Sequence, residues 1–197
     1  MLTGTAALIL AGGRASRMGG GDKPLLELAG SSMIARIIAA IDAGPIAISA
    51  NGDPARFAAF GLPVLADGVL AGEGPLAGVL AGLEWAVGLG ADVLLTVPGD
   101  TPFIPKGLAA ALSPAPACAA SGGRVHPLVA LWPVGCRGEL RRLLSVPGRR
   151  DVAHFAQSIG MRRVDFPVVK WDAFMNVNTP DDLTAARAIA DIAEGET

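Results

Sequence analysis

The chain has 197 residues, of which 51% are hydrophobic, and a formal net charge of −2. This length favours one domain, residues 1–197, and so small a net charge excludes a general attraction to nucleic acid or to an anionic membrane. The two cysteines, Cys118 and Cys136, lack the spacing and the histidine neighbours of a zinc or redox site. The apolar N-terminus lacks the basic segment of a signal peptide. We therefore expect a cytoplasmic protein, a monomer or weak oligomer, that binds neither nucleic acid nor membrane.

Strand and helix patterns alternate along the chain. Apolar runs predict strands at residues 5–10, 45–50, 63–65, 92–97, 125–132 and 162–166. Apolar spacings of three and four, with capping residues, predict helices at residues 31–41, 54–60, 75–87, 105–112, 134–145 and 151–159 and from Thr179 onward. Pro127 suggests an edge or a bulge in its strand, and residues 113–120 are interpreted as a Pro/Ala connector. The alternation predicts a three-layer α/β fold, a mostly parallel twisted sheet with helices on both faces, whose ligand lies outside the carboxyl ends of the strands.

A glycine-dense loop follows the first predicted strand, in the segment LILAGGRASRMGGGDK at residues 8–23. Glycine lets backbone N–H groups point at an anion, and the basic side chains of Arg14, Arg17 and Lys23 supply charge for a polyphosphate. Lys23 follows Asp22 and precedes Pro24, which excludes a Walker A loop, and the glycines lack the register of the dinucleotide fingerprint. We interpret the segment as a phosphate-binding loop; the alternative is a flexible turn with incidental arginines.

A second motif, VPGDTPF at residues 97–103, delivers Asp100 to the ligand edge of the predicted sheet. Prolines on both sides, Pro98 and Pro102, stiffen this turn. A carboxylate opposite a basic glycine loop suits Mg²⁺, which usually takes one or two carboxylates together with phosphate oxygens. The alternative is an aspartate that only stabilises the turn.

Polar residues follow two other predicted strands at the same edge. Asn51 comes after the second strand and Asp67 after the third, and each is either a nucleotide contact or a turn residue. Asn176 and Asn178 line a pocket or cap the last helix, and His126 is a structural histidine or an exposed residue near a ligand. The pair Arg149 and Arg150 is either an anion contact or a solvated helix end.

Taken together, these segments resemble those of the molybdenum cofactor guanylyltransferase family, whose members have a Rossmann-like nucleotidyltransferase fold. The resemblance covers nearly the whole chain, and its order and spacing are more specific than any one motif. It is carried by LAGGRASRMGGGDK at residues 10–23, ISAN at 48–51, GPLAG at 74–78, PGDTPF at 98–103, HPL at 126–128, GRR at 148–150, VDF at 164–166 and NVNTPDDL at 176–183.

The resemblance implies which residues bind the substrates. GTP contacts are implied for Leu10, Ala11, Gly12, Gly13, Lys23, Asn51, Asp67 and Asp100, and Mg²⁺ binding is implied for Asp100. Similar cytidylyltransferases carry LAAG and DQP where this chain has LAGG and DTP, which favours GTP over CTP. The acceptor is expected to dock opposite the GTP, along the C-terminal half of the chain, where His126, Asn176, Asn178 and the Arg149–Arg150 pair are candidate contacts.

The implied reaction is the transfer of GMP from GTP to the terminal phosphate of molybdopterin, with release of pyrophosphate. Arg17, Lys23 and Asp100 are the expected catalytic residues. Expected partners are GTP, molybdopterin and, among proteins, a cofactor-delivery protein or a molybdoenzyme. Alternatives are a sugar-1-phosphate nucleotidyltransferase, which the sequence DKPL at residues 22–25 suggests, a molybdopterin cytidylyltransferase, and a nucleotide sensor without catalysis.

Overall fold

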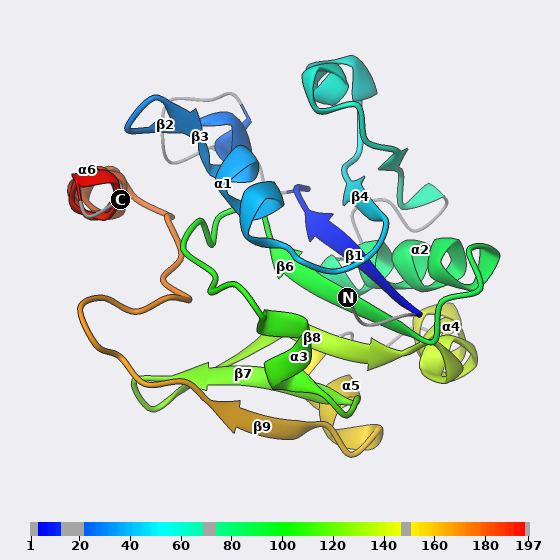
Figure 1. The fold of residues 1–197 in the computed structure, drawn as a ribbon. Helices are drawn as coiled ribbons and strands as arrows, with labels where there is room; N and C mark the ends of the chain where they lie inside the picture. Colours follow the sequence, from blue (N-terminus) through cyan, green and yellow to red (C-terminus); the bar gives the residue numbers. More distant parts are fainter. Residues whose placement is uncertain (1–3, 13–21, 69–73, 147–150, 196–197) are drawn as a thin grey trace.

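A seven-stranded sheet forms the centre of the molecule in the computed structural model, which describes residues 4–12, 22–68, 74–146 and 151–195 (Figure 1). The strand order is β5-β4-β1-β6-β8-β7-β9, and among these strands β8 alone runs antiparallel to its neighbours. The strands are β1 Thr5–Leu10, β4 Ile46–Ser49, β5 Val64–Leu65, β6 Val93–Pro98, β7 Ala117–Ser121, β8 Arg124–Pro133 and β9 Arg162–Asp165. The predicted mostly parallel sheet is confirmed.

Strand β1 lies in the middle of the parallel part, between β4 and β6. Five of its six residues are buried, because helices cover both faces of the sheet at this strand. Leu10 is in register with Ser49 of β4 and with Pro98 of β6, so these three strands end at one level. The three loops that follow therefore emerge side by side at one edge of the sheet.

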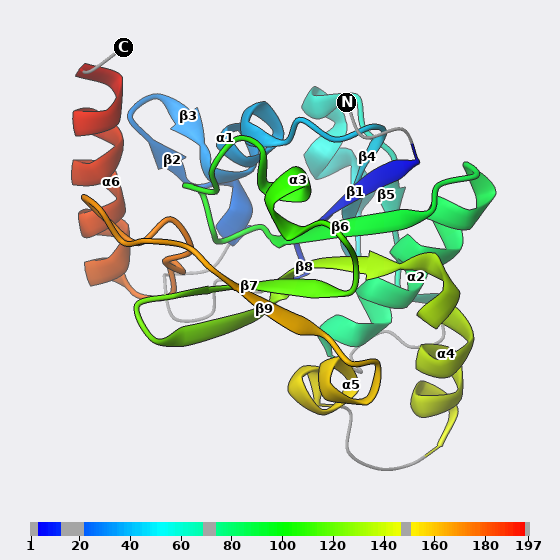
Figure 2. The same ribbon diagram turned by 60° about the horizontal axis from the view of Figure 1, so that its bottom comes forward.

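Helices cover the two faces of the sheet as separate layers (Figure 2). On one face, α1 (Met33–Ala40), the 3₁₀ segment η2 (Pro54–Phe60) and α3 (Leu108–Leu112) pack through Ile37, Phe57 and Leu112. On the other face, α2 (Pro75–Gly88), α4 (Arg137–Ser145) and α5 (Val152–Ser158) bury an apolar cluster that includes Trp132. The predicted three-layer α/β architecture is confirmed.

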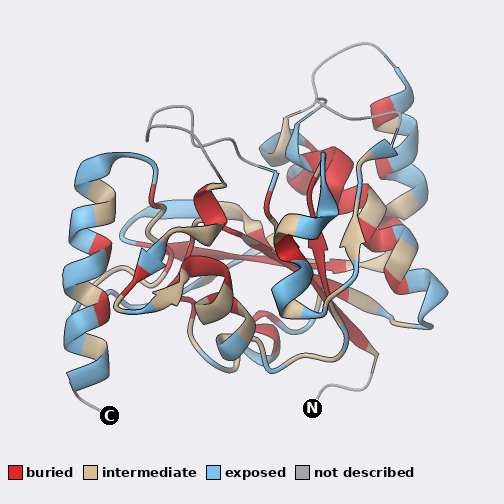
Figure 3. Cartoon of the chain, turned by 90° about the horizontal axis from the view of Figure 1, so that it is seen from above, coloured by how far each residue is buried: buried red, intermediate tan, exposed pale blue. Residues whose placement is uncertain are grey.

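The C-terminal helix α6 (Pro180–Gly195) lies apart from the sheet, beside the hairpin of β2 (Glu27–Leu28) and β3 (Ser31–Ser32) (Figure 1). Most of its surface is exposed, and a narrow buried stripe faces the hairpin (Figure 3). That stripe contains Ala186 and Ala190, which pack with Leu28 and Val177. This packing holds Val177, and with it the chain segment that leads into α6, beside the hairpin.

The structure corrects the prediction of a connector at residues 113–120. Residues Ala117–Ser121 form β7, an inner strand between β8 and β9, and all five of them are buried. Pro127 lies in β8 within a register shift, since Cys118 pairs with Ala130 but Ala119 pairs with His126. The bulge alternative for Pro127 is therefore the correct one, and the edge alternative is wrong because β8 is an inner strand.

Smaller differences concern the ends and types of helices. The helix expected from Pro105 begins at Leu108, and the segment Pro54–Phe60 is a 3₁₀ helix. The segment Val134–Cys136 (η4) is also a 3₁₀ helix and leads into α4, and the 3₁₀ segment η1 spans Lys23–Leu25.

Cys118 and Cys136 are free and buried, and burial raises the pKa of the Cys136 thiol to about 11. Among the described residues, no helix is both long and apolar enough to span a membrane.

Candidate active site

A cleft of about 460 Å³ opens at the carboxyl ends of the parallel strands. Open parallel sheets bind ligands at this edge, because the loops after several strands meet there. The residues that line it are Leu10, Gly12, Lys23, Pro24, Ser49, Asn51, Asp67, Gly74, Pro75, Gly78, Pro98, Asp100, Leu128 and Asn176. The loop after β1, the ends of β4, β5 and β6 and the start of α2 thus contribute to one cavity.

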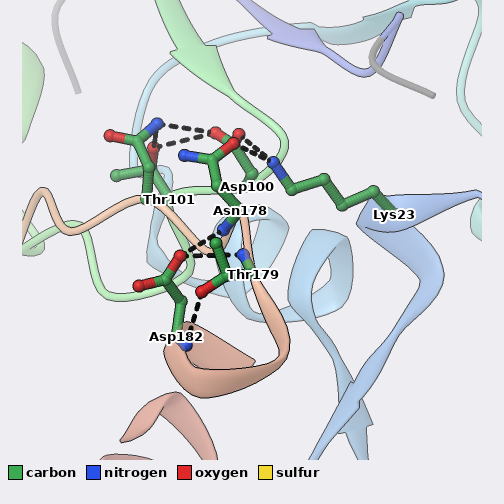
Figure 4. A network of polar contacts seen from close by, with 7 residues as sticks. Lys23, Asp100, Thr101, Asn178, Thr179 and Asp182 are labelled. Carbon is green, nitrogen blue, oxygen red and sulfur yellow. Dashed lines mark hydrogen bonds and ion pairs between the residues drawn. The ribbon is translucent and has the colours of Figure 1, made fainter. Parts of the chain in front are cut away.

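Lys23 and Asp100 face each other in this cleft (Figure 4). The Lys23 ammonium lies 2.6 Å from Asp100 Oδ2 and also donates to Asn178 Oδ1 at 2.6 Å. The lysine side chain is only 10% exposed and that of the aspartate 21%. Because each charge is largely withdrawn from water, the pair is held by mutual attraction and by the added amide oxygen.

The segment of residues 176–178 brings both asparagines to this pair. The Val177 N–H donates to the backbone oxygen of Asp100, and the Val177 side chain is fully buried beside α6. Asn176 donates to Asp100 Oδ1 at 2.8 Å, and Asn178 accepts from Lys23, so the residues on both sides of Val177 reach the pair.

Asp182 anchors the far end of that segment at the start of α6 (Figure 4). Its Oδ2 accepts from the backbone N–H groups of Asn178 and Thr179, at 2.9 and 2.8 Å. The Thr179 hydroxyl accepts from the Asp182 N–H in return, which is a reciprocal helix cap. The bond from the Asn178 N–H is the main cause that lowers the pKa of Asp182 below its ordinary value.

Asn51 and Asp67, which the sequence predicted at this edge, are joined by two hydrogen bonds. Asn51 Nδ2 donates to Asp67 Oδ2 at 2.7 Å, and the Asp67 N–H donates to Asn51 Oδ1 at 3.0 Å. The Ser49 hydroxyl adds a weaker bond to Asp67 Oδ1 at 3.5 Å. The ends of β4 and β5 are thereby held together on one side of β1, and β6, which leads to Asp100, lies on the other side.

Glycines bring backbone close to the cleft at two places. A Cβ on Gly78 of α2 would lie 2.5 Å from the Ser49 hydroxyl and 3.1 Å from a Leu10 methyl. A Cβ on Gly99 would lie 3.0 Å from Pro24. Pro24, the residue after Lys23, therefore packs on the turn that carries Asp100, which gives the DKPL sequence a structural reason.

The first turn of α2 lines the cleft, and it is the positive end of the helix dipole.

Not every residue singled out from the sequence lies in the cleft. Gly13, Arg14, Arg17, Arg149 and Arg150 lie outside the described residues. His126 does not line the cleft; its Nε2 lies 2.9 Å from the Ser121 hydroxyl, and its ring packs on Phe174. The Ser121 hydroxyl donates its hydrogen to Asp172, so the Nε2 atom of His126 carries the proton of that contact. Burial lowers the pKa of His126 below its ordinary value.

The sequence analysis missed Ser49 and Leu128, which line the cleft, and Arg56, which lies behind it. Arg56, in η2, donates from Nη1 to Asp22 Oδ1 and from Nη2 to the backbone oxygen of Asn51, both at 2.6 Å. Its only sequence signal was a basic residue inside a predicted helix close behind Asn51. Nothing in a single sequence points that side chain back to Asp22.

Asp100 is the carboxylate beside Lys23 that could hold a divalent metal ion together with a substrate. In the described part of the chain, no three His, Cys, Asp or Glu side chains gather to hold a metal ion. Asp100 lines the cleft with the oxygen atoms of Thr101 and Asn178 in its surroundings. Mg²⁺ commonly binds through one or two carboxylates and completes its shell with phosphate oxygens and water. A single carboxylate is therefore sufficient when the substrate is a nucleotide.

A mostly parallel sheet with Lys23, Asp100 and a helix N-terminus at its carboxyl edge is typical of a nucleotide-binding α/β protein. Residues 7–160 match the family model of the MobA-like NTP transferase domain. The chain belongs to this family and is a nucleotidyltransferase. Nucleotidyltransferases of this type generally depend on a divalent metal ion.

Relatives named molybdenum cofactor guanylyltransferase match nearly end to end. The protein of Acidiphilium cryptum is 55% identical over 184 residues, which cover 92% of this chain and 93% of that protein. The protein of Rhodopseudomonas palustris strain BisB5 is 48% identical over 197 residues, which cover 94% of each. A solved structure of molybdopterin-guanine dinucleotide biosynthesis protein A from Archaeoglobus fulgidus has the same fold, with a TM-score of 0.73 and 21% identity over 95% of this chain and 99% of that one.

Proposed function

We propose that this chain transfers GMP from GTP to the terminal phosphate of molybdopterin and releases pyrophosphate. The observation that carries the proposal is the contact of Lys23 with Asp100 in a cleft whose opposite side is the Asn51–Asp67 pair. One side thus offers charge for phosphates and a metal ion, and the other offers an amide and a carboxylate for the nucleoside. The names of the relatives at 55% and 48% identity support this choice of reaction.

The nucleotide would lie along the edge of the sheet, from β5 towards β6. Asn51 and Asp67 would contact the nucleoside, and the backbone of Leu10, Ala11, Gly12 and Gly13 would contact the phosphates. The N-terminal turn of α2 adds positive potential to the same cavity. Lys23 and, from the same loop, Arg17 would bind the β- and γ-phosphates.

The chemical step is an attack by a phosphate oxygen of the acceptor on the α-phosphorus of GTP. The new oxygen–phosphorus bond forms as the bond between the α-phosphorus and the bridging oxygen breaks, and pyrophosphate leaves with that oxygen. The acceptor oxygen is already anionic, so the step needs no general base. Asp100 would hold Mg²⁺, which supplies positive charge that offsets the repulsion between the two phosphates. Lys23 and Arg17 would stabilise the charge that develops on the departing pyrophosphate.

The acceptor would enter from the side of the segment at residues 176–178. Asn176 and Asn178 lie beside Asp100, where the attacking phosphate must arrive. His126, whose Nε2 bonds to Ser121, would contact the acceptor from beside the cleft. Delivery of the acceptor by a partner protein, in the cytoplasm, completes the proposal.

Calorimetry with GTP, CTP, ATP and UTP in the presence of Mg²⁺ tests the choice of nucleotide. We expect GTP to bind at least about tenfold more tightly than the others, which corresponds to about 1.4 kcal/mol. A preference for CTP or UTP would overturn the guanylyl assignment and point to a cytidylyl or sugar-nucleotide enzyme. Pyrophosphate release with molybdopterin and GTP then separates an enzyme from a nucleotide sensor.

A further inference from the structure

Arg56 joins the two sides of the cleft through its guanidinium fork. One arm reaches the Asp22 carboxylate and the other reaches the backbone oxygen of Asn51, each at 2.6 Å. Asp22 directly precedes Lys23, and the Asn51 side chain forms hydrogen bonds with Asp67. A single rigid group therefore bridges the lysine side and the Asn51 side of the site.

The local structure holds this guanidinium in one place. Arg56 lies in the short 3₁₀ helix η2, which Asp53 caps by accepting from the Ala55 N–H at 2.9 Å. The guanidinium carbon lies 5.0 Å from the ring centre of Phe57, which is fully buried against the sheet. The side chains of Arg56 and Asp22 are 28% and 23% exposed, so the ion pair is substantially shielded from water.

The third nitrogen of the Arg56 guanidinium, Nε, indicates that the side chain is held in place at an energetic cost. The Nε atom is buried and has no hydrogen-bond partner among the described residues. Leaving a buried donor unpaired is unfavourable. The chain tolerates this cost while the two Nη atoms keep their short contacts to Asp22 and to Asn51, which favours a positional role over a purely stabilising one.

We propose that Arg56 is a positioning residue that sets the separation between the nucleoside-contacting side and the phosphate-contacting side of the nucleotide site. The inference rests on the proposed binding of a nucleoside triphosphate in the cleft and not on which base is bound. Arg56 does not touch the substrate in this account; it acts through Asn51 on one side and through Asp22 and Lys23 on the other. A nucleotide that contacts both sides then binds to a site whose two halves are already spaced for it.

This role predicts a specific pattern of binding losses for Arg56→Gln and Arg56→Lys, neither of which can bridge two acceptors with a planar fork. GTP spans both halves, so its affinity should fall about tenfold or more as the preorganised spacing is lost. GMP and inorganic tripolyphosphate each test mainly one half, so their affinities should stay within about twofold of the wild type. A residue that only stabilised the fold would weaken all three ligands together.

The experiment measures GTP binding by calorimetry and binding of the two fragments by competition with a fluorescent nucleotide, for wild type and variants. Arg141→Gln is the matched control, because Arg141 forms an ion pair of the same 2.6 Å length with Glu84 on the exposed surface. Asp22→Asn removes the charge at the other end of the bridge and should reproduce the pattern if an Arg56 variant fails to fold. Equal losses for GTP and its fragments, or unchanged GTP affinity, would overturn the proposal. If the proposed function is wrong, the wild type will prefer CTP or UTP to GTP. The affinities of that nucleotide, of its monophosphate and of tripolyphosphate are then compared between wild type and variants in the same way.

Discussion

The Lys23 ammonium lies 2.6 Å from a carboxylate oxygen of Asp100, a residue 77 positions away in the sequence. The first residue comes from the loop after β1 and the second from the turn after β6, and these are neighbouring strands of the sheet. The structure thus places the expected phosphate-binding cation directly on the expected metal-binding carboxylate. Binding of a metal nucleotide requires this pair to exchange partners, because each group would then face opposite charge on the ligand.

Substitution of either member of this pair should strongly reduce turnover with little change of fold. For Asp100→Asn and Lys23→Met we expect kcat to fall a few hundred-fold, since loss of one such electrostatic contact costs about 3–4 kcal/mol of barrier. Pyrophosphate release gives the rate, and circular dichroism checks the fold. Glu84→Gln, which breaks the exposed pair with Arg141, serves as the control and should retain full activity. A fully active Asp100→Asn enzyme would contradict the metal assignment.

Asn178→Ala separates a contact to the acceptor from a contact to Lys23. The Asn178 oxygen accepts from the Lys23 ammonium at 2.6 Å, so its removal should let the lysine shift even with no acceptor present. We expect GTP affinity, measured by calorimetry in the absence of acceptor, to fall about three- to tenfold, the equivalent of one ordinary hydrogen bond. Unchanged GTP affinity together with a raised KM for the acceptor would show that the residue serves the acceptor alone.

Gly78→Ala tests the close approach of α2 to the cleft. The added methyl group would lie 2.5 Å from the Ser49 hydroxyl and 3.1 Å from a Leu10 methyl, so either these side chains or α2 must shift at the ends of β1 and β4. Overpacking of this kind costs about 1–3 kcal/mol, and thermal unfolding should show it together with weaker GTP binding. Gly88→Ala is the matched control in the same helix, because its methyl group meets nothing within 4 Å. It should leave binding unchanged and stabilise the protein by up to about 1 kcal/mol.

His126 should make stability depend on pH between neutral and mildly acidic conditions. Burial lowers its pKa in the folded chain below the ordinary value of 6.5, so the unfolded chain binds the proton more readily. Its contribution to stability is complete above pH 6.5 and is lost as the pH falls from there through the lowered pKa. Denaturant unfolding at several pH values should show this decline for the wild type and a shallower one for His126→Gln. The chain has two histidines, so the same variant identifies the His126 resonance in an NMR titration; a pKa above 6.5 would contradict the account.

The sequence predicted the sheet well where strands are apolar and β-branched. The runs at Thr5–Leu10 and Val93–Pro98 stand out because strands covered on both faces are nearly continuous in apolar residues. Strand β7 was missed because Ala117–Ser121 consists of small residues that follow a proline-rich stretch, a composition more typical of a connector. Its burial between β8 and β9 comes from tertiary packing, which no local pattern reports.

The candidate site was predictable as a set of positions but not as a set of contacts. Asn51 and Asp67 could be placed at one edge because each follows a parallel strand, and the structure adds that they bond to each other. The contact of Lys23 with Asn178 spans 155 positions and depends on how Val177 docks beside α6. Arg56 carried no motif, because its role comes from where η2 lies in space.

Guanylyl transfer is measured by incubating the purified chain with molybdopterin, Mg²⁺ and either GTP or CTP, and following both pyrophosphate and the dinucleotide product by mass spectrometry. We expect molybdopterin guanine dinucleotide and pyrophosphate to form in equal amounts with GTP, and the reaction to stop when the metal ion is chelated. Product formed with CTP in preference to GTP, or GTP bound without any release of pyrophosphate, would contradict this expectation.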